Sequence, residues 1–219
     1  MAVRGLFISF EGGEGSGKSA QCAALVKYFE DRGHAVRFVR EPGGTSLGER
    51  VRDILLFQEG VAIAPETEAL LFTAARAQLT RDVIRPALES GTHVIADRFF
   101  DSTFAYQGYG RGIDLTLLRA LTQFAVGTTT PDITFLLDLP IESAQERIRA
   151  RGERWDRIER AEEPLHLRVR DGYLTLARQE PQRWTVIDAT RAAADIGAIV
   201  RARIDEALSE RVNRIAFRR

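Results

Sequence analysis

The stretch that decides the fold is FISFEGGEGSGKS, residues 7–19. An apolar run ends two residues before Gly12, and residues 20–29 continue as an amphipathic helical pattern. Residues 12–19 fit G-x-x-x-x-G-K-[ST], a pattern whose glycines let a loop wrap around a triphosphate and turn its backbone N–H groups inward. A helix that begins near Lys18 points its positive N-terminal end at the same phosphates. We therefore predict a strand, a phosphate-binding loop and a helix, in that order.

Each position of this loop has an expected role. Lys18 would reach the β- and γ-phosphates and contribute to catalysis, and Ser19 would place its hydroxyl on Mg²⁺. The alternative is a glycine-rich turn with an incidental Lys-Ser pair, which would leave the flanking strand and helix patterns without a reason. The predicted nucleotide-binding residues are Gly12, Gly13, Glu14, Gly15, Ser16, Gly17, Lys18 and Ser19.

Composition narrows the class of protein. The 219 residues are enough for one well-filled domain, and we expect residues 1–219 to form it. Acidic and basic residues balance at 31 each, so no global field recruits nucleic acid or an anionic membrane. The chain has one cysteine, Cys22, no apolar run of membrane-spanning length and no signal sequence at its N-terminus. We expect a cytoplasmic protein with neither nucleic acid nor membrane as a partner.

Apolar runs alternate with longer helical patterns along the chain. This alternation predicts a parallel sheet with helices on both faces. Such sheets bind their ligands at the carboxyl ends of the strands. Together with the phosphate-binding loop, it predicts an α/β fold of the P-loop NTPase type with a five-stranded parallel sheet. The expected strands are Leu6–Phe10, Ala35–Val39, His93–Ala96, Ile133–Leu137 and Thr185–Ile187.

The third expected strand ends in the pair Asp97-Arg98. An acidic residue at this place, after the strand of the phosphate-binding loop, is typical of the carboxylate that helps to hold Mg²⁺. Arg98 would point at phosphate, where a planar guanidinium binds in a bidentate way. An ordinary Asp–Arg ion pair is the alternative. We predict Ser19 and Asp97 as the metal ligands.

Two further stretches carry groups suited to a base or a sugar. A helix opened by Pro65 places Phe72 and Arg76 on one face, although such a ring is more often in the core and such an arginine on the surface. Residues 101–112 bring hydroxyl, amide and aromatic groups together, but Gly108 and the glycines after it also fit a flexible turn. Before them, Arg50 and Arg52 lie early on a helix that follows the turn 40–46.

An arginine-rich helix follows the fourth strand. It carries Arg147, Arg149, Arg151, Arg154 and Arg157, with Gly152 as a place where the helix can break. So many like charges repel one another unless anions are nearby. We interpret residues 147–158 as a helical lid over bound ATP. A solvated basic helix, offset by neighbouring glutamates, is the alternative.

These motifs, in this order, resemble the thymidylate kinase family in its bacterial form. No single motif beyond the phosphate-binding loop is specific, but together they are highly specific. They extend over about residues 5–190. The resemblance is carried by residues 10–19, 40–45, 71–76, 97–98, 102–108, 149–153, 156–159 and 187–190.

The resemblance implies phosphorylation of dTMP to dTDP by a homodimeric enzyme that uses ATP and Mg²⁺, a step in dTTP synthesis. Phe72 would stack on thymine, and Arg76, Thr103 and Gln107 would bind its polar edge. Arg52 and Arg98 would hold the dTMP phosphate, Glu14 the 3′-hydroxyl end, and Tyr106 would occupy the space that a ribose 2′-hydroxyl needs. The implied substrate-binding residues are Glu14, Glu41, Arg52, Phe72, Arg76, Arg98, Ser102, Thr103, Tyr106 and Gln107.

The same resemblance assigns the catalytic residues as Lys18, Arg98 and Arg151, with Arg147 on ATP. Family members without a lid arginine use a basic residue inside the phosphate-binding loop. Here that stretch is Gly13-Glu14-Gly15-Ser16, which contains none. The resemblance therefore implies that Arg151, in the lid, is the arginine that reaches the transferring phosphoryl group.

Three alternatives remain at this point. A P-loop GTPase would need a guanine-reading Asn-Lys-x-Asp after a late strand, where this chain has Leu-Leu-Asp-Leu-Pro at residues 136–140. A kinase for dUMP or another pyrimidine monophosphate is a stronger alternative, since the residues alone do not choose thymine over uracil. An ATP-driven nucleic-acid motor fits poorly with the balanced charge.

Overall fold

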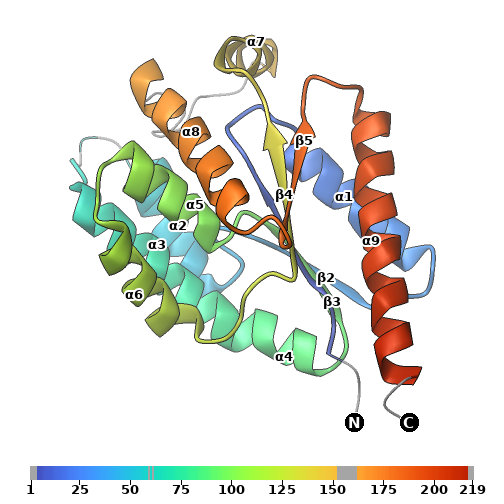
Figure 1. Cartoon of the computed structure of the whole chain (residues 1–219). Coiled ribbons are helices and arrows are strands. Elements are labelled where there is room, and N and C mark those ends of the chain that lie inside the picture. The colour runs from blue at the N-terminus through green and yellow to red at the C-terminus, as the bar shows by residue number, and fades with distance from the viewer. Residues whose placement is uncertain (1–3, 59, 61, 152–161, 217–219) are drawn as a thin grey trace.

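The structure is a computed structural model that describes residues 4–58, 60, 62–151 and 162–216. Five parallel strands form one sheet in the order β2-β3-β1-β4-β5 (Figure 1). This confirms the predicted sheet, and each strand lies within about a residue of its expected place. The strands are β1 (Phe7–Glu11), β2 (Val36–Arg40), β3 (His93–Asp97), β4 (Ile133–Asp138) and β5 (Trp184–Asp188).

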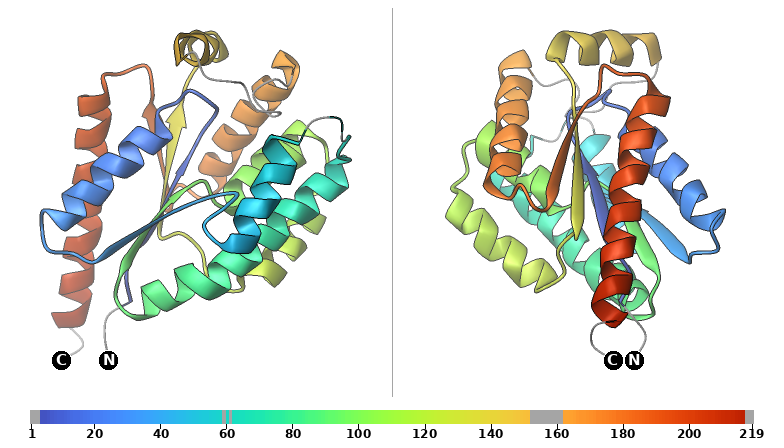
Figure 2. Two further views of the ribbon diagram at one scale, coloured as in Figure 1. Left: turned by 180° about the vertical axis from the view of Figure 1, so that it is seen from behind. Right: turned by 45° about the vertical axis from the view of Figure 1, so that its right-hand side comes forward.

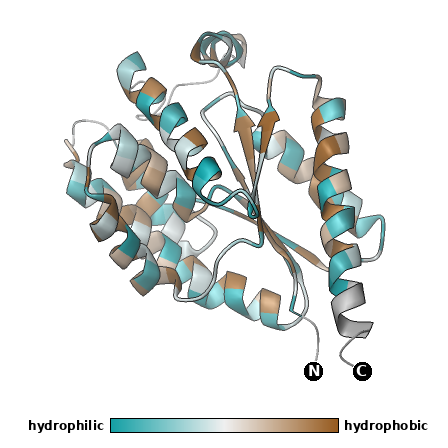
Figure 3. Cartoon of the chain, in the orientation of Figure 1, coloured by the Kyte–Doolittle hydropathy of each residue, from teal (hydrophilic) through white to brown (hydrophobic). Residues whose placement is uncertain are grey.

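Helices cover both faces of the sheet, as Figure 2 shows from two further sides. The strands alternate their side chains between the faces, so Ile8 and Phe10 enter one core cluster while Phe7 enters the other. Helices α1 (Lys18–Glu30) and α9 (Ala193–Ala216) cover the first face. The second is covered mainly by α3 (Pro65–Leu79), α4 (Arg85–Glu89), α6 (Leu115–Val126) and α8 (Glu163–Gln179). Both sides of the central strands β1, β3 and β4 are therefore buried, and β4 and β5 are largely brown in Figure 3.

The remaining helices lie near the carboxyl ends of the strands. They are α2 (Ser46–Leu56), α5 (Phe100–Thr103) and α7 (Ile141–Arg151). Figure 1 shows α7 beyond the ends of β4 and β5, with both chain termini at the opposite end of the sheet. Among the described residues, no helix is long and apolar enough to cross a membrane.

Two segments adopt the wider π-helical turn. One, Thr80–Ile84, joins α3 to α4 and leads into Pro86, which has no N–H to continue an α-helical ladder. The helix then continues through Pro86 to Glu89.

The other π segment is Phe104–Gly110, and it excludes a flexible turn starting at Gly108, which was the alternative interpretation of these glycines. Gly108 and Gly110 are helical and buried. A Cβ atom on Gly108 would lie 2.5 Å from Cδ2 of Leu115, and one on Gly110 would lie 3.0 Å from Cδ1 of Leu165. These glycines therefore let the segment pack closely against α6 and α8. Residues 111–114 then continue as irregular chain to α6.

Candidate active site

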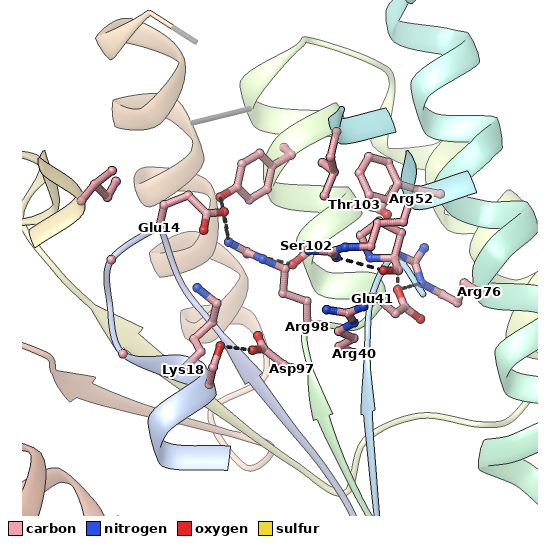
Figure 4. Close-up of a pocket in the computed structure, with 18 of the residues that line it drawn as sticks. Glu14, Lys18, Arg40, Glu41, Arg52, Arg76, Asp97, Arg98, Ser102 and Thr103 are labelled. Carbon is pink, nitrogen blue, oxygen red and sulfur yellow. Dashed lines mark hydrogen bonds and ion pairs between the residues drawn. The ribbon is translucent and has the colours of Figure 1, made fainter. Parts of the chain in front are cut away.

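A cavity of about 610 Å³ lies at the carboxyl ends of the strands, the edge that the fold predicts (Figure 4). Its walls come from the phosphate-binding loop, the end of β2, α2, α3, the end of β3, the second π segment and α7. The cavity brings together most of the residues predicted from the sequence: Glu14, Gly15, Gly17, Lys18, Ser19, Glu41, Arg52, Phe72, Arg76, Asp97, Arg98, Ser102, Thr103, Tyr106, Gln107 and Arg147.

Gly12 and Gly13 lie on the other side of the loop, where they line a smaller cavity of about 70 Å³ between α7 and α8. Gly12 has φ +137, and a Cβ atom there would lie 2.5 Å from the carbonyl oxygen of Leu137. The loop thus passes too close to β4 to carry a side chain at this position. Ser16 donates to the Gly13 carbonyl oxygen at 2.9 Å, a contact within the loop.

Lys18, the first residue of α1, extends its ammonium group into this loop. Its Nζ donates to the carbonyl oxygen of Gly13 at 2.8 Å. Burial and the nearby charge of Arg98 lower the pKa of Lys18, while Glu14 and Asp97 oppose that shift. A buried ammonium beside inward-facing backbone groups is the arrangement that binds phosphate oxygens.

The two predicted metal ligands meet at the carboxyl end of the sheet. The Ser19 hydroxyl donates to Oδ2 of Asp97 at 2.6 Å, which joins the start of α1 to the end of β3. Hydroxyl and carboxylate oxygens are donors that Mg²⁺ accepts, and Mg²⁺ usually completes its shell with waters and substrate phosphates. These residues therefore fit Mg²⁺.

Arg98 holds the centre of the cavity. Its φ of 70 is unusual for a residue with a side chain, and several contacts hold it there. Nη1 donates to the Gly12 carbonyl oxygen at 2.9 Å and to the Tyr173 hydroxyl at 3.0 Å. Nη2 forms an ion pair with Glu14 and donates to the Tyr106 hydroxyl at 3.2 Å. One guanidinium thus links the phosphate-binding loop, the second π segment and α8.

Charge determines the protonation state of Glu14. Burial raises the pKa of a carboxyl group, but here the charges of Arg98 and Lys18 outweigh burial and lower the pKa of Glu14 to about 2. Glu14 is consequently a carboxylate at neutral pH and can only accept hydrogen bonds. Burial lowers the pKa of Arg98, but the negative charge of Glu14 outweighs burial and raises it.

Behind Arg98 lies Glu11, which is fully buried. Its carboxyl group accepts the Phe99 N–H at 2.8 Å, the Ser102 hydroxyl at 2.6 Å and the Tyr173 hydroxyl at 3.1 Å. Burial, together with the neighbouring carboxylate of Asp101, raises the pKa of Glu11 to about 8. Glu11 anchors the hydroxyl groups that contact Arg98.

The far end of the cavity is an aromatic recess with polar walls. Arg76 is only 1% exposed, and its Nε donates to Oε2 of Glu41 at 2.7 Å. Phe72 is half-buried, so the usual expectation for these two residue types is reversed. Among the described residues no partner contacts Arg76 Nη1 or Thr103 Oγ1, although both atoms are buried and both residues line the cavity. Buried groups of this kind indicate a polar ligand, because burial without a partner is costly.

Of the predicted lid, 147–158, the structure describes residues 147–151 at the end of α7, and Arg147 is the residue there that contacts the phosphate-binding loop. Its Nη1 donates to the Gly15 carbonyl oxygen at 3.4 Å and its Nη2 to that of Ala189 at 2.9 Å. It therefore bridges the phosphate-binding loop and the segment after β5. The side chain of Arg151, and residues 152–158 with Arg154 and Arg157, lie outside the described part of the chain.

Comparison with known proteins gives the family. The family model described as thymidylate kinase matches residues 10–198. The chain belongs to the thymidylate kinase family. It is 49% identical to the thymidylate kinase of Thermomicrobium roseum over 92% of this chain and 95% of that one. It is also 49% identical to the enzyme of Deinococcus radiodurans over 93% of this chain and 98% of that one.

A solved structure of this family has the same fold. It is the thymidylate kinase from Ehrlichia chaffeensis, which is 34% identical with a TM-score of 0.73 and covers 94% of this chain and 99% of that one. This likeness confirms the P-loop NTPase fold that the first strand and its loop predict.

Sequence reasoning missed several residues that support this thymidylate kinase site. Glu11 and Tyr173 hold Arg98 and Ser102, and Glu68 contacts Gln107. Glu11 carried a signal, since it is a charged residue at the end of an otherwise apolar strand. Glu68 carried a weaker one, because it shares a helix face with Phe72 and Arg76 at successive spacings of four. Tyr173 carried none, because only the packing of α8 brings it to the site.

Proposed function

We propose that this protein transfers the terminal phosphoryl group of Mg-ATP to dTMP, giving dTDP and ADP, as a step in dTTP synthesis. The observation that carries the proposal is the pair of unpartnered polar groups, Arg76 Nη1 and Thr103 Oγ1, in the recess of the cavity that also contains Lys18. The base of a nucleoside monophosphate would bind in the recess, and the triphosphate of ATP would bind near Lys18 at the other end of the same cavity.

The recess suits a pyrimidine base. The ring of Phe72 offers a stacking face, and Arg76 supplies an N–H donor for a carbonyl oxygen at the base edge. Glu41 holds Arg76 in place through its Oε2, which lies 2.7 Å from both Nε and Nη2 of Arg76. Its Oε1 is buried without a partner among the described residues and is left to accept from the substrate. Thr103 and Gln107 lie one helical turn apart on the facing segment.

The sugar and phosphate of dTMP would lie between the recess and the loop. Arg98 and Arg52 line this region and supply positive charge for the phosphate, and Ser102 lies beside Arg98 at 3.3 Å. Glu14, ionised and paired with Arg98, would accept the 3′-hydroxyl. Tyr106, whose hydroxyl lies 3.3 Å from Glu14, would occupy the neighbouring space that a 2′-hydroxyl needs.

The reaction requires positioning and charge neutralisation more than covalent chemistry. A phosphate oxygen of dTMP attacks the γ-phosphorus of ATP, the bond from that phosphorus to the bridging oxygen breaks, and ADP leaves. Lys18 and the loop N–H groups hold the β- and γ-phosphates, while Arg98 aligns the attacking phosphate. Arg151 would stabilise charge on the transferring group, and Arg147 would contact ATP. Mg²⁺, held by Ser19 and Asp97, supplies charge neutralisation of the phosphate oxygens when bound.

The enzyme would act as a homodimer. On α3 and α6 the side chains of Leu70, Leu117 and Phe124 are 54%, 53% and 91% exposed. Large apolar side chains at such exposure favour a partner surface, and twofold dimers are the commonest assembly. The buried free thiol of Cys22 suits a reducing cytoplasm, where we place the enzyme.

A coupled assay of ADP release with purified protein tests the activity. The substrates are dTMP, dUMP, dCMP, dAMP and dGMP at equal concentration, with Lys18→Ala as the control for contaminating kinases. We expect the highest kcat/KM with dTMP and a loss of activity in Lys18→Ala. A higher kcat/KM with any other monophosphate would overturn the proposed substrate.

A further inference from the structure

Glu68 is a buried carboxylate that does not line the cavity but touches a residue that does. It lies in the first turn of α3 and is 2% exposed. Its Oε1 accepts from Nε2 of Gln107 at 2.8 Å, and Arg111 donates to both carboxylate oxygens at 3.4 Å. Arg111 supplies the opposite charge that a buried carboxylate requires. The contact therefore joins α3 to the second π segment beneath the base recess.

An ionised carboxylate has acceptors only, so it fixes the orientation of the amide that contacts it. The Gln107 amide must turn its donor, Nε2, toward Glu68 and keep its acceptor, Oε1, for another direction. Gln107 is itself 2% exposed and lines the cavity. Within the described part of the chain no group donates to this Oε1. The acceptor of Gln107 is consequently the atom that remains for a ligand.

We infer that Glu68 is a specificity-determining positioning residue, which holds the Gln107 amide so that an acceptor faces the nucleobase beside the donor of Arg76. This inference rests on the proposed binding of dTMP in the recess. A carbonyl next to a ring N–H, as in thymine and uracil, matches a donor next to an acceptor. Cytosine presents an amino donor next to a ring acceptor, so its donor would face the Arg76 donor and its acceptor would face the Gln107 acceptor. Sites built on buried hydrogen bonds discriminate strongly because a mismatch leaves protein groups unpaired.

The test is Glu68→Gln, compared on dTMP and 5-methyl-dCMP, two substrates that differ only at the polar edge of the base. A glutamine at 68 can donate to Gln107, which frees the Gln107 amide to turn its Nε2 toward the base. We expect the ratio of kcat/KM for dTMP over 5-methyl-dCMP to fall at least about tenfold, the size of one altered hydrogen bond. The KM for ATP should stay within about twofold, since Glu68 lies away from the phosphate-binding loop.

Glu66→Gln is the matched control. It makes the same chemical change two residues earlier on α3, where the side chain is exposed. We expect its substrate ratio to equal that of the wild type. A Glu68→Gln enzyme that loses activity equally on both substrates, with an unchanged ratio, would overturn the role and leave Glu68 as a packing residue.

A second measurement uses the unmodified enzyme. The Nε2–H signals of Gln107 in a ¹⁵N–¹H spectrum should stay protected from solvent exchange with and without dTMP, because they face Glu68. A large shift of those signals on dTMP binding would mean that the donor contacts the base, which overturns the inference even if Glu68→Gln fails to fold. Failure of wild-type enzyme to phosphorylate dTMP would instead overturn the proposed function, so the two failures are distinguishable.

Discussion

Glu11 shows how the site uses a buried carboxyl group that does not line the cavity. Its partners are the hydroxyl groups of Ser102 and Tyr173 and the backbone of Phe99. With a pKa of about 8 in the folded protein, against 4.5 without these surroundings, Glu11 keeps its proton over a wide range in which an unfolded chain has lost it. The free energy of unfolding should therefore fall as pH rises from about 4.5 to about 8.

Glu11→Gln tests this dependence, because an amide resembles the protonated carboxyl group and does not titrate. We expect the difference in unfolding free energy between variant and wild type to move in favour of the variant from pH 5.5 to pH 8.5. The change should be at least about 1.4 kcal/mol, the equivalent of one pKa unit. Urea denaturation at both pH values measures it. A difference that is independent of pH would mean that Glu11 is ionised in the folded protein at neutral pH.

At the residue scale, the sequence predicted the residues of local motifs but not the hydrogen-bond networks between distant residues. The positions of Lys18 and Ser19 in the cavity follow from local spacing, because a loop of this type positions its own residues. The ion pair of Arg76 with Glu41 joins residues that are 35 apart, so it depends on how α3 packs against the end of β2. A buried arginine is also rare enough that sequence statistics place it on the surface.

The second π segment is the element that the sequence concealed. Helical periodicity does not reveal a wider turn, and glycines at 108, 110 and 112 favour a loop in any local interpretation. The reason for these glycines is tertiary, since α6 and α8 approach closely. Strands, in contrast, were predictable to within about a residue, because the central strands β1, β3 and β4 are short apolar runs buried on both faces.

Gly172 on α8 makes the close approach testable. A Cβ atom there would lie 2.7 Å from Cβ and Cγ of Tyr109. Gly172→Ala should destabilise the protein by about 1–3 kcal/mol through overpacking, despite the higher helix propensity of alanine. Thermal unfolding measures this, with the exposed position Ser209 changed to alanine as a control on α9. An increase in Tm would show that Tyr109 moves aside without cost.

Helix α7 is the element on which the lid proposal depends. Arg147 already contacts the phosphate-binding loop, and Arg151 lies one turn further along the same helix face. An arginine that meets the transferring phosphoryl group stabilises the transition state more than bound ATP, and such residues contribute about 10³–10⁵ in rate. Arg151→Ala should therefore lower kcat by about two orders of magnitude or more and leave both KM values within a few-fold.

Steady-state kinetics with each substrate varied in turn measures kcat and both KM values separately. Arg149→Ala is the comparison, since the Arg149 side chain contacts Gln145 on its own helix at 3.5 Å. If Arg151→Ala keeps a near-normal kcat while Arg149→Ala does not, the catalytic arginine is Arg149.

At the scale of the whole molecule, the proposed dimer surface and the substrate site share their elements. Helix α3 carries Phe72 and Arg76 toward the cavity, while Leu70 on the same helix is exposed. Helix α6 packs through Leu115 and Leu118 against Gly108, next to Gln107. A partner that covers the outer surface of α3 and α6 would therefore hold the inner surface in place.

Phe124→Glu tests this coupling, because Phe124 is the most exposed of these side chains and a charge there opposes an apolar contact. We expect light scattering at micromolar concentration to give twice the chain mass of 24.5 kDa for the wild type and a single chain mass for Phe124→Glu. Leu167→Glu on α8, where the side chain is 45% exposed, should remain a dimer. A wild-type protein at 24.5 kDa would contradict the dimer, and a dimeric Phe124→Glu would contradict this surface. In the proposed site α3 and the second π segment bind the base rather than ATP, so the monomeric variant should raise the KM for dTMP several-fold and change that for ATP little.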